Sequence, residues 1–164
     1  MILTGNEIER QFNLGNISLY PFLKSNLNPN SYNYRIDNKI KIFTHLSNSK
    51  PVFVELEIPE EGYILEPGKM YLANTLETIG SNKYAMSLIG KSSMGRLGLF
   101  LQVSANLGHT NSKHKWTLEL VASKAIRIYK NMIIGQVSFW KNTGDIPDYV
   151  GFYGKQDNIQ ESNL

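Results

Sequence analysis

The sequence predicts an all-β protein, a β-barrel or jelly roll with one short helix at its N-terminus. Apolar and polar residues alternate over many short segments, and turn residues separate these segments at nearly regular intervals. A length of 164 residues with 41% apolar content suits one globular domain over residues 1–164. No internal repeat or linker divides the chain, so we expect a single domain.

The first predicted element is a short helix near the N-terminus. Thr4 and Glu7 have the spacing of a capping box, and apolar residues follow them at helical spacing. Gly15 is suited to the C-terminal turn of a helix, so this helix is expected to end within residues 13–16.

Strands are expected where short apolar runs stand between turn residues. In chain order these runs are 17–20, 31–36, 40–43, 52–58, 70–79, 84–89, 100–105, 116–122, 126–129 and 132–140. Pro67 and Gly68 occupy the central positions of a predicted type II turn. A short helical turn is expected to begin near Ser92 or Ser93, because serine is a favoured N-cap.

The stretch GKSSMGRLGL, residues 90–99, has the composition of an anion site. Free N–H groups at the start of a helical turn bind anions, and Lys91 adds a positive charge beside them. Arg96 lies four residues after Ser92, so both side chains would share one face of the turn. This arrangement suits a phosphate chain. An ordinary surface turn explains the stretch equally well when it is taken alone.

A second candidate is Glu119, which stands between Leu118 and Leu120 in an apolar strand. Strand alternation places Glu119 on the face opposite the two leucines. One interpretation is a solvent-exposed face. The other is a carboxylate in a half-dry pocket, with its pKa raised towards neutrality so that it can transfer protons.

Composition excludes several function classes. A net charge of +3 suits a small anionic ligand and does not require nucleic acid. The absence of cysteine excludes disulfides, thiol catalysis and the zinc nucleobase deaminases, which need thiolate ligands. The sequence has no signal peptide and no apolar run near ~18 residues. We therefore expect a cytoplasmic protein that does not contact membranes.

Taken together, the motifs resemble the dCTP deaminase branch of the dUTPase-like superfamily. The matching segments are 1–9 (MILTGNEIE), 27–35 (LNPNSYNYR), 65–68 (LEPG), 90–99 (GKSSMGRLGL), 103–105 (VSA), 118–119 (LE) and 132–139 (MIIGQVSF). They cover nearly the whole chain in the right order. The resemblance implies a dUTPase-like barrel and a homotrimer with sites at the subunit interfaces.

The resemblance also assigns catalytic roles. Glu119 occupies the position of the family's proton-transferring glutamate. Ser92 and Arg96 match residues that position the base and the water, and Ala105 matches a residue whose carbonyl holds that water. Ser31 and Arg35 fall in a segment that is structural in the family, so we keep them out of the site.

Nucleotide binding is implied for a further group. The matching positions are Lys91, Ser92 and Ser93, which would hold the triphosphate, and Lys155 and Gln160 in a C-terminal arm. By composition, residues 144–164 would pass for a frayed terminus. In the family this arm closes over the bound nucleotide. No tightly bound cofactor is expected, and Mg²⁺ would arrive with the triphosphate.

One segment departs from the family. The family pattern Ala-x-x-Ile-Asp-Pro-Gly-x-x-Gly is here ANLGHTNSKH, residues 105–114, so His109 replaces the aspartate. In the dUTPase relatives this aspartate orients the hydrolytic water, which argues against pyrophosphatase activity. The segment also surrounds sugar and base, so His109 is assigned to nucleotide binding. His109 and His114 lack a nearby acidic residue and are expected at the surface, not on a metal.

We therefore expect metal-independent hydrolytic deamination of a cytosine nucleotide, dCTP or a close variant, to the uracil nucleotide and ammonia. The small Gly108 and the donor His109 are expected to change the nucleotide preference, although drift of this loop without effect is an equal alternative. A non-catalytic nucleotide-binding or regulatory protein on the same scaffold is the second hypothesis. A dUTP pyrophosphatase is the third and weakest.

Overall fold

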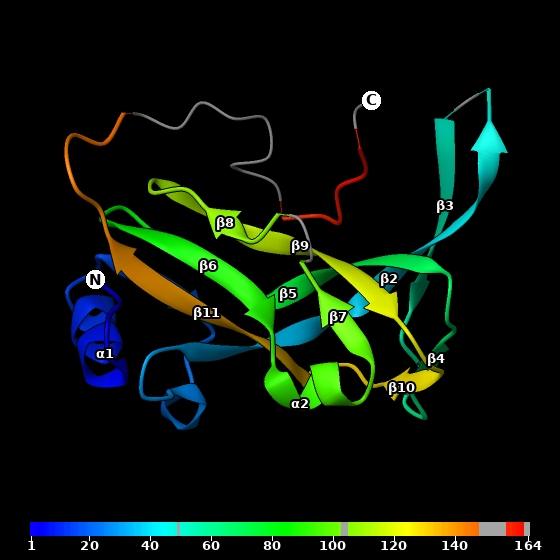
Figure 1. The fold of residues 1–164 in the computed structure, drawn as a ribbon, viewed down its shortest axis with the longest axis horizontal. Coiled ribbons are helices and arrows are strands. Elements are labelled where there is room, and N and C mark those ends of the chain that lie inside the picture. The colour runs from blue at the N-terminus through cyan, green and yellow to red at the C-terminus, as the bar shows by residue number, and fades with distance from the viewer. Residues whose placement is uncertain (49, 103–104, 148–156, 163–164) are drawn as a thin grey trace.

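The computed structural model describes residues 1–48, 50–102, 105–147 and 157–162, and it is built mostly of strands (Figure 1). The helical elements are α1 (Gly5–Asn13), the 3₁₀ turn η1 (Lys24–Asn26) and α2 (Ser92–Arg96). The strands are β1 (Ile17–Tyr20), β2 (Tyr32–Ser47), β3 (Lys50–Glu57), β4 (Tyr63–Leu65), β5 (Met70–Ser81), β6 (Tyr84–Gly90), β7 (Leu99–Leu101), β8 (Leu107–Gly108), β9 (Ser112–Ala122), β10 (Ile126–Ile128) and β11 (Ile133–Lys141). None of these described helices is long and apolar enough to span a membrane.

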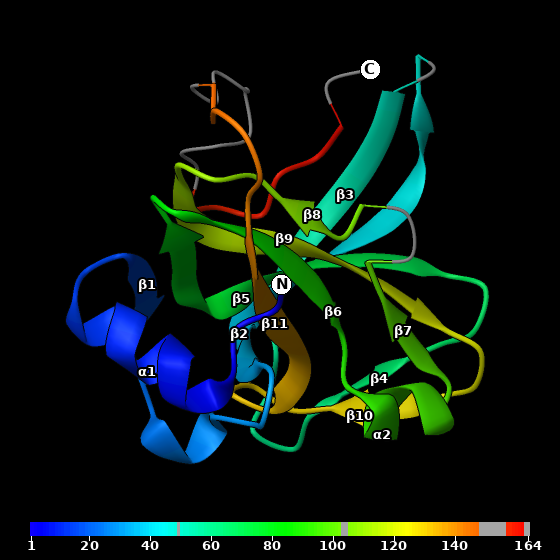
Figure 2. The same cartoon turned by 60° about the vertical axis from the view of Figure 1, so that its left-hand side comes forward.

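Nine strands form one antiparallel sheet in the order β7-β9-β5-β2-β11-β6-β8, with β1 on β5 and β3 on β2. Strands β4 and β10 form a separate pair. Figures 1 and 2 show that the large sheet curls into a half-barrel, with α1 on its outside. Its core contains the fully buried rings of Tyr32, Tyr34, Tyr71 and Phe139. The predicted mostly-β architecture with a short N-terminal helix is confirmed.

Strand β2 is longer than the sequence pattern predicted. The segments 31–36 and 40–43, expected as two strands, belong to one strand of 16 residues. Polar residues at 37–39 interrupt the alternation, and the register with β5 shifts between Ile36 and Ile40. A bulge therefore keeps the chain in the sheet where the pattern alone suggested a break.

Several other boundaries differ from the prediction by one or two residues, and those of β9 and β7 differ by four. Strand β9 begins at Ser112 instead of 116, because its polar first residues pair with the end of β5 and thereby override their weak strand propensity. Strand β7 ends at Leu101, four residues earlier than expected. Helix α2 begins at Ser92, as predicted, but its N-cap is Lys91 and not a serine, and no side chain caps this turn.

Helix α1 follows the predicted signals. The Thr4 hydroxyl accepts a hydrogen bond from the Glu7 backbone N–H at 3.4 Å, while the Glu7 carboxylate pairs with Arg10 at 2.6 Å. Gly15 takes a φ of +75°, and the N–H of Asn16 bonds the Gln11 carbonyl at 3.0 Å. A left-handed glycine with a bond back to the last turn is a common helix end.

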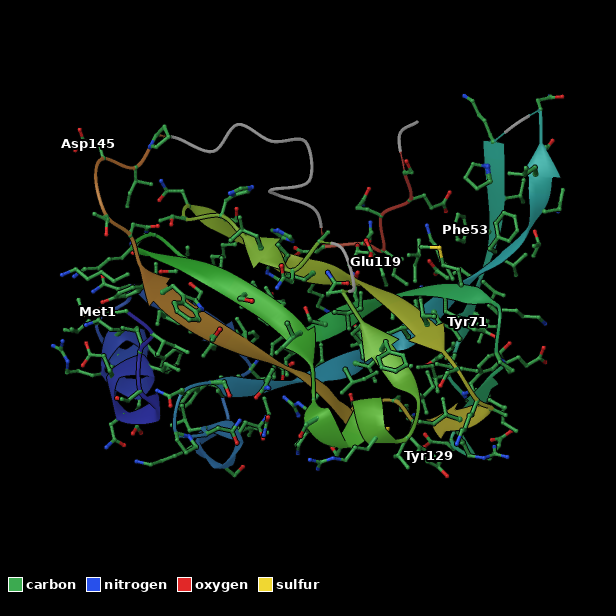
Figure 3. All side chains as sticks on the ribbon, viewed as in Figure 1. Met1, Phe53, Tyr71, Glu119, Tyr129 and Asp145 are labelled. Carbon is green, nitrogen blue, oxygen red and sulfur yellow. The ribbon has the colours of Figure 1, made fainter. Side chains whose placement is uncertain are left out.

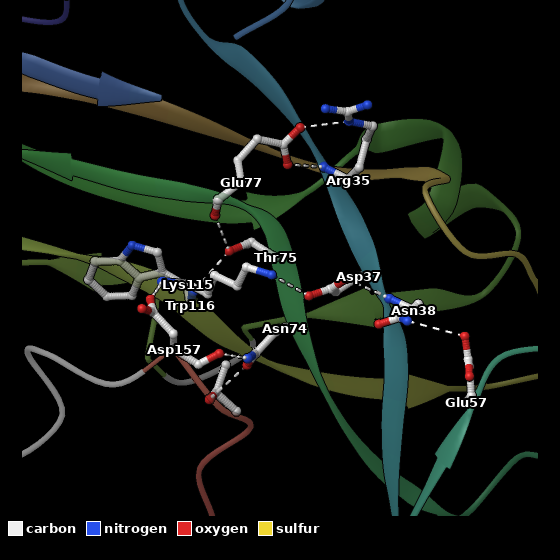
Figure 4. Close-up of polar contacts among 11 residues, drawn as sticks. Arg35, Asp37, Asn38, Glu57, Asn74, Thr75, Glu77, Lys115, Trp116 and Asp157 are labelled. Atoms are coloured by element: carbon white, nitrogen blue, oxygen red, sulfur yellow. Dashed lines mark hydrogen bonds and ion pairs between the residues drawn. The ribbon is translucent and has the colours of Figure 1, made fainter. Parts of the chain in front are cut away.

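A buried ion pair joins β2 to β5 inside the half-barrel (Figure 4). The fully buried Glu77 carboxylate accepts from the Arg35 backbone N–H at 2.8 Å and from Arg35 Nε at 2.7 Å. The Ser31 hydroxyl donates to Gln136 Oε1 at 2.9 Å. Ser31 and Arg35 are thus both engaged in contacts within the fold.

Candidate active site

A cavity of about 800 Å³ lies between β9, the β2–β3 hairpin, the loop before β8 and the C-terminal segment 157–162. Its apolar wall comes from Phe43, Phe53 and Leu72, and the two phenylalanines meet edge to face at 5.9 Å. Figure 3 shows Glu119 and Phe53 beside the C-terminal segment. The hairpin's contribution could not be read from the sequence, because no local pattern indicates which strand a hairpin faces.

Glu119 enters this cavity from the middle of β9. Leu118 and Leu120 are fully buried in the core, whereas Glu119 is half-buried and lines the cavity. Opposite it, Leu72 on β5 lies against the same space. The predicted alternation is confirmed, and the carboxylate stands in a half-apolar pocket instead of on an open face.

Ala105 lines the same cavity as Glu119 and is linked to the Glu119 backbone by a residue that the sequence analysis missed. Gln102 accepts a hydrogen bond from the Glu119 backbone N–H at 2.8 Å, and its amide group donates to the Ala105 carbonyl at 3.2 Å. A glutamine inside a predicted strand carries no signal of such a role. The role depends on the end of β7 at Leu101, one residue before Gln102.

The two histidines differ from each other and, in part, from the prediction. His109 is exposed, as expected, and it lines the cavity. His114 was expected at the surface, but it is only 6% exposed and its ring lies 4.2 Å from the Trp116 ring centroid. Burial lowers the pKa of His114, which favours the neutral ring. Among the described residues, no group of three His, Asp or Glu is placed to hold a metal.

Gly108 does not enlarge the cavity as expected. An added Cβ at Gly108 would lie 2.9 Å from Trp116 Cη2 and 3.0 Å from Met86 Cβ. The residue is buried and its missing side chain is filled by protein. Gly108 therefore lets β8 pack on Trp116, and protein atoms fill the space that a side chain at this position would take.

The described part of the C-terminal segment docks on β9 beside Glu119. The Asp157 carboxylate accepts from the Lys115 backbone N–H at 3.0 Å (Figure 4). The Gln160 N–H donates to the Thr117 hydroxyl at 3.0 Å. Glu161 pairs with Lys41 at 2.8 Å. Gln160, which the sequence analysis placed in the C-terminal arm, lines the cavity. Lys155 lies outside the described residues.

The predicted triphosphate-binding residues, together with Arg96, lie in another part of the structure. Ser92, Ser93 and Arg96 are on α2, at the end of the molecule opposite the C-terminal segment in Figures 1 and 2. Lys91 and Ser92 line a separate cavity of about 320 Å³, together with Phe100. None of the four predicted residues Lys91, Ser92, Ser93 and Arg96 lines the large cavity. The carboxylate half and the cationic half of the predicted site are therefore apart within one chain.

Charge in the large cavity agrees with this division. Among its described lining residues, Lys115 is the one lysine or arginine, and its ammonium group pairs with Asp37 at 2.6 Å. An anionic nucleotide would therefore find polar and apolar contacts here, but little unpaired positive charge. If this cavity holds the base, the triphosphate must be bound by residues other than the described residues that line it.

Comparison with known proteins gives matches over most of the chain. A family model described as dCTP deaminase-like matches residues 2–142. The protein named dCTP deaminase, dUMP-forming, of Hathewaya histolytica is 39% identical over 168 residues and covers 100% of this chain and 97% of the relative. The protein of the same name in Clostridium acetobutylicum is 40% identical over 168 residues, with coverages of 100% and 96%.

A solved structure shares the fold. The 2′-deoxycytidine 5′-triphosphate deaminase from Agrobacterium tumefaciens matches with a TM-score of 0.70 at 19% identity. The match covers 86% of this chain and 48% of the Agrobacterium chain, so the half-barrel corresponds to about half of that longer protein. At this identity the likeness concerns the fold alone.

Proposed function

The chain belongs to the dCTP deaminase-like family, and from this premise we propose that it hydrolytically deaminates dCTP or a close cytosine nucleotide. The observation that carries the proposal is the half-buried Glu119 carboxylate in the large cavity, with the Ala105 carbonyl tied to its strand. A carboxylate and a fixed acceptor suit the capture and deprotonation of one water. The names of the relatives, dCTP deaminase, support the same reaction.

The proposed reaction needs one water and one proton-transferring group. Glu119 takes a proton from a water held by the Ala105 carbonyl while the water oxygen attacks C4 of the cytosine ring. The same proton passes from Glu119 to N3. In the second half, Glu119 moves the proton of the new hydroxyl to the amino group, which leaves as ammonia. No metal is needed in this scheme, because the carboxylate activates the water.

We propose that a second copy of the chain completes the site in a homotrimer. The separation of α2 from Glu119 within one chain supports this, since Lys91, Ser92, Ser93 and Arg96 would reach the triphosphate and base only from a neighbour. Exposed apolar side chains supply a surface for association. Met70, Val121 and Phe100 lie side by side on β5, β9 and β7 and are 45%, 42% and 45% exposed. Any Mg²⁺ would be carried by the triphosphate oxygens.

The product has two candidates. The relatives' name, dUMP-forming, favours hydrolysis of the triphosphate after deamination, which gives dUMP. His109 stands where the dUTPase relatives have the aspartate that orients the water for triphosphate hydrolysis, and its presence favours release of dUTP. The two products differ by one pyrophosphate, so they are separable in one assay.

The test is a screen of dCTP, CTP, dCMP, CMP and 5-substituted dCTP for ammonia release, with pyrophosphate measured in the same reactions and in a parallel reaction with dUTP. We expect ammonia from dCTP or a close variant, and no loss of rate with a zinc chelator once Mg²⁺ is restored. Tight nucleotide binding without ammonia from any substrate would instead support the non-catalytic regulatory protein. Pyrophosphate from dUTP without deamination would support the pyrophosphatase.

A further inference from the structure

Gln102 occupies a backbone conformation that ordinary side chains avoid. It follows the last residue of β7, it is 8% exposed, and its φ is +51°. A left-handed φ is uncommon for a residue other than Gly, Asn or Asp, and it persists where surrounding contacts hold it. We therefore expect the contacts of Gln102 with its neighbours to hold it in this backbone conformation.

Both ends of the Gln102 amide are in use. Its Oε1 accepts from the Glu119 N–H at 2.8 Å, and its Nε2 donates to the Ala105 carbonyl at 3.2 Å. The Gln102 N–H also points to the Glu119 carbonyl, at 3.4 Å. Because an N–H needs an acceptor and a carbonyl needs a donor, only one orientation of the amide satisfies both partners.

The side chain thus extends the β7–β9 ladder by one position. Leu101 pairs with Leu120, so the next pair along the ladder would be Gln102 with Glu119. The chain leaves the sheet at Gln102, and the side-chain oxygen acts as the acceptor for the Glu119 N–H. The same side chain then reaches the loop three residues later and holds the carbonyl of Ala105.

We propose that Gln102 is a positioning residue that fixes the Ala105 carbonyl relative to Glu119. The inference rests on the proposed deamination, in which a water must lie between these two groups. A carbonyl oxygen has two lone pairs, so Ala105 can accept from Gln102 and from the water together. Among the described residues, the Gln102 amide is the hydrogen-bond donor that holds this carbonyl.

The two hydrogen bonds require a side chain at position 102 that has both an acceptor and a donor. Methionine has a similar length but neither a strong donor nor a strong acceptor. Glutamate keeps the acceptor but can donate to Ala105 only when it is protonated. Glycine adopts the left-handed φ without strain and removes the side chain, so it separates the turn from the link.

The experiment compares Gln102→Met, Gln102→Gly and Gln102→Glu with the unmodified protein. Gln136→Met is the matched control, because Gln136 is a partly buried glutamine that accepts from Ser31 on the other part of the sheet. Steady-state ammonia release gives kcat and KM for the best substrate. Amide hydrogen exchange at Glu119, measured by NMR, reports the link without reference to catalysis.

We expect Gln102→Met and Gln102→Gly to lower kcat by about 100-fold, the scale of a small displacement of a reacting group. KM should change much less, because the nucleotide contacts remain. The Glu119 amide should exchange faster in both variants, while Gln136→Met leaves kcat and this amide unchanged. For Gln102→Glu, the ratio of its kcat to that of the unmodified protein should rise as the pH falls, because the protonated acid regains the donor.

Several results would overturn the proposal. Unchanged exchange at Glu119 in Gln102→Met would show that the link does not exist in solution. Normal kcat in Gln102→Gly would show that the turn and not the side chain matters, and an equal loss in Gln136→Met would indicate general destabilisation. No ammonia from the unmodified protein would overturn the proposed function and the positioning role with it, while the exchange at Glu119 would still decide whether the link exists.

Discussion

Replacing Glu77 by glutamine should destabilise the fold far more than the same change at the surface. The Glu77 carboxylate is fully buried and uses one oxygen for the Arg35 N–H and the other for Arg35 Nε. An amide has a single acceptor oxygen, so one of these two donors would face an NH₂ group. Arg35 Nη2 already has no hydrogen-bond partner among the described residues, so no second acceptor is at hand there.

The magnitude follows from this geometry. Removing one partner of a buried ion pair costs about 3–5 kcal/mol. The Arg35 side chain is 17% exposed and Glu77→Gln preserves volume, so we expect the lower end, about 3 kcal/mol. For a chain of this size each kcal/mol lowers Tm by roughly 2–4 °C, which gives a fall of about 6–12 °C.

Thermal unfolding by circular dichroism and calorimetry, at one fixed protein concentration, measures this shift. The control is Glu55→Gln, which breaks the Lys39–Glu55 pair, whose side chains are 55% and 41% exposed. Surface ion pairs contribute little to stability, so its Tm should stay close to that of the unmodified protein. Equal shifts for the two variants would refute the reasoning, because burial would then make no difference to the value of the pair.

Four further predictions concern the site. Glu119→Gln should lower ammonia release by at least about 100-fold while nucleotide binding survives in calorimetry; a near-normal rate would remove Glu119 from the mechanism. Mixed and reassembled Glu119→Gln and Arg96→Ala chains should regain part of the activity that each lacks alone, whereas no recovery and a monomer mass in light scattering would contradict a shared site. His109→Asp restores the family's carboxylate and should raise pyrophosphate release above that of the unmodified protein, and an unchanged yield would show that this position does not decide the product. Because burial lowers the pKa of His114 from its usual 6.5, the unfolded chain takes up this proton first, so stability should fall as the pH drops below about 6.5, and His114→Asn should remove that part of the loss in urea unfolding at a series of pH values.

Local patterns were sufficient for most strands, for α1 and for the orientation of Glu119. Strand alternation depends on neighbouring residues only, so the position of Glu119 opposite Leu118 and Leu120 could be read directly from the sequence. The helix signals at Thr4 and Gly15 are equally local, and both were observed. The family resemblance was readable for the same reason, because its motifs are short runs of adjacent residues.

The walls of the cavity were decided by tertiary structure. Which strands face Glu119 depends on sheet order and curl, and these bring Phe43 and Phe53 of the hairpin over β9. His114 looked like a surface residue in a polar segment, but the pairing of β9 with β5 buries it against Trp116. Long-range pairing sets such environments, and no window of neighbouring residues contains it.

The role of Gln102 and the position of α2 could not be predicted from the local sequence pattern either. The end of β7 one residue before Gln102 turns an ordinary strand glutamine into a link between Glu119 and Ala105. The curl of the sheet places α2, which carries Arg96, at the opposite end of the molecule from the cavity, although the sequence analysis assigned Arg96 to the same site as Glu119. The sequence was enough to predict which chemical groups form the site, because their types and spacing are local. Their distances from one another are set by the three-dimensional path of the sheet.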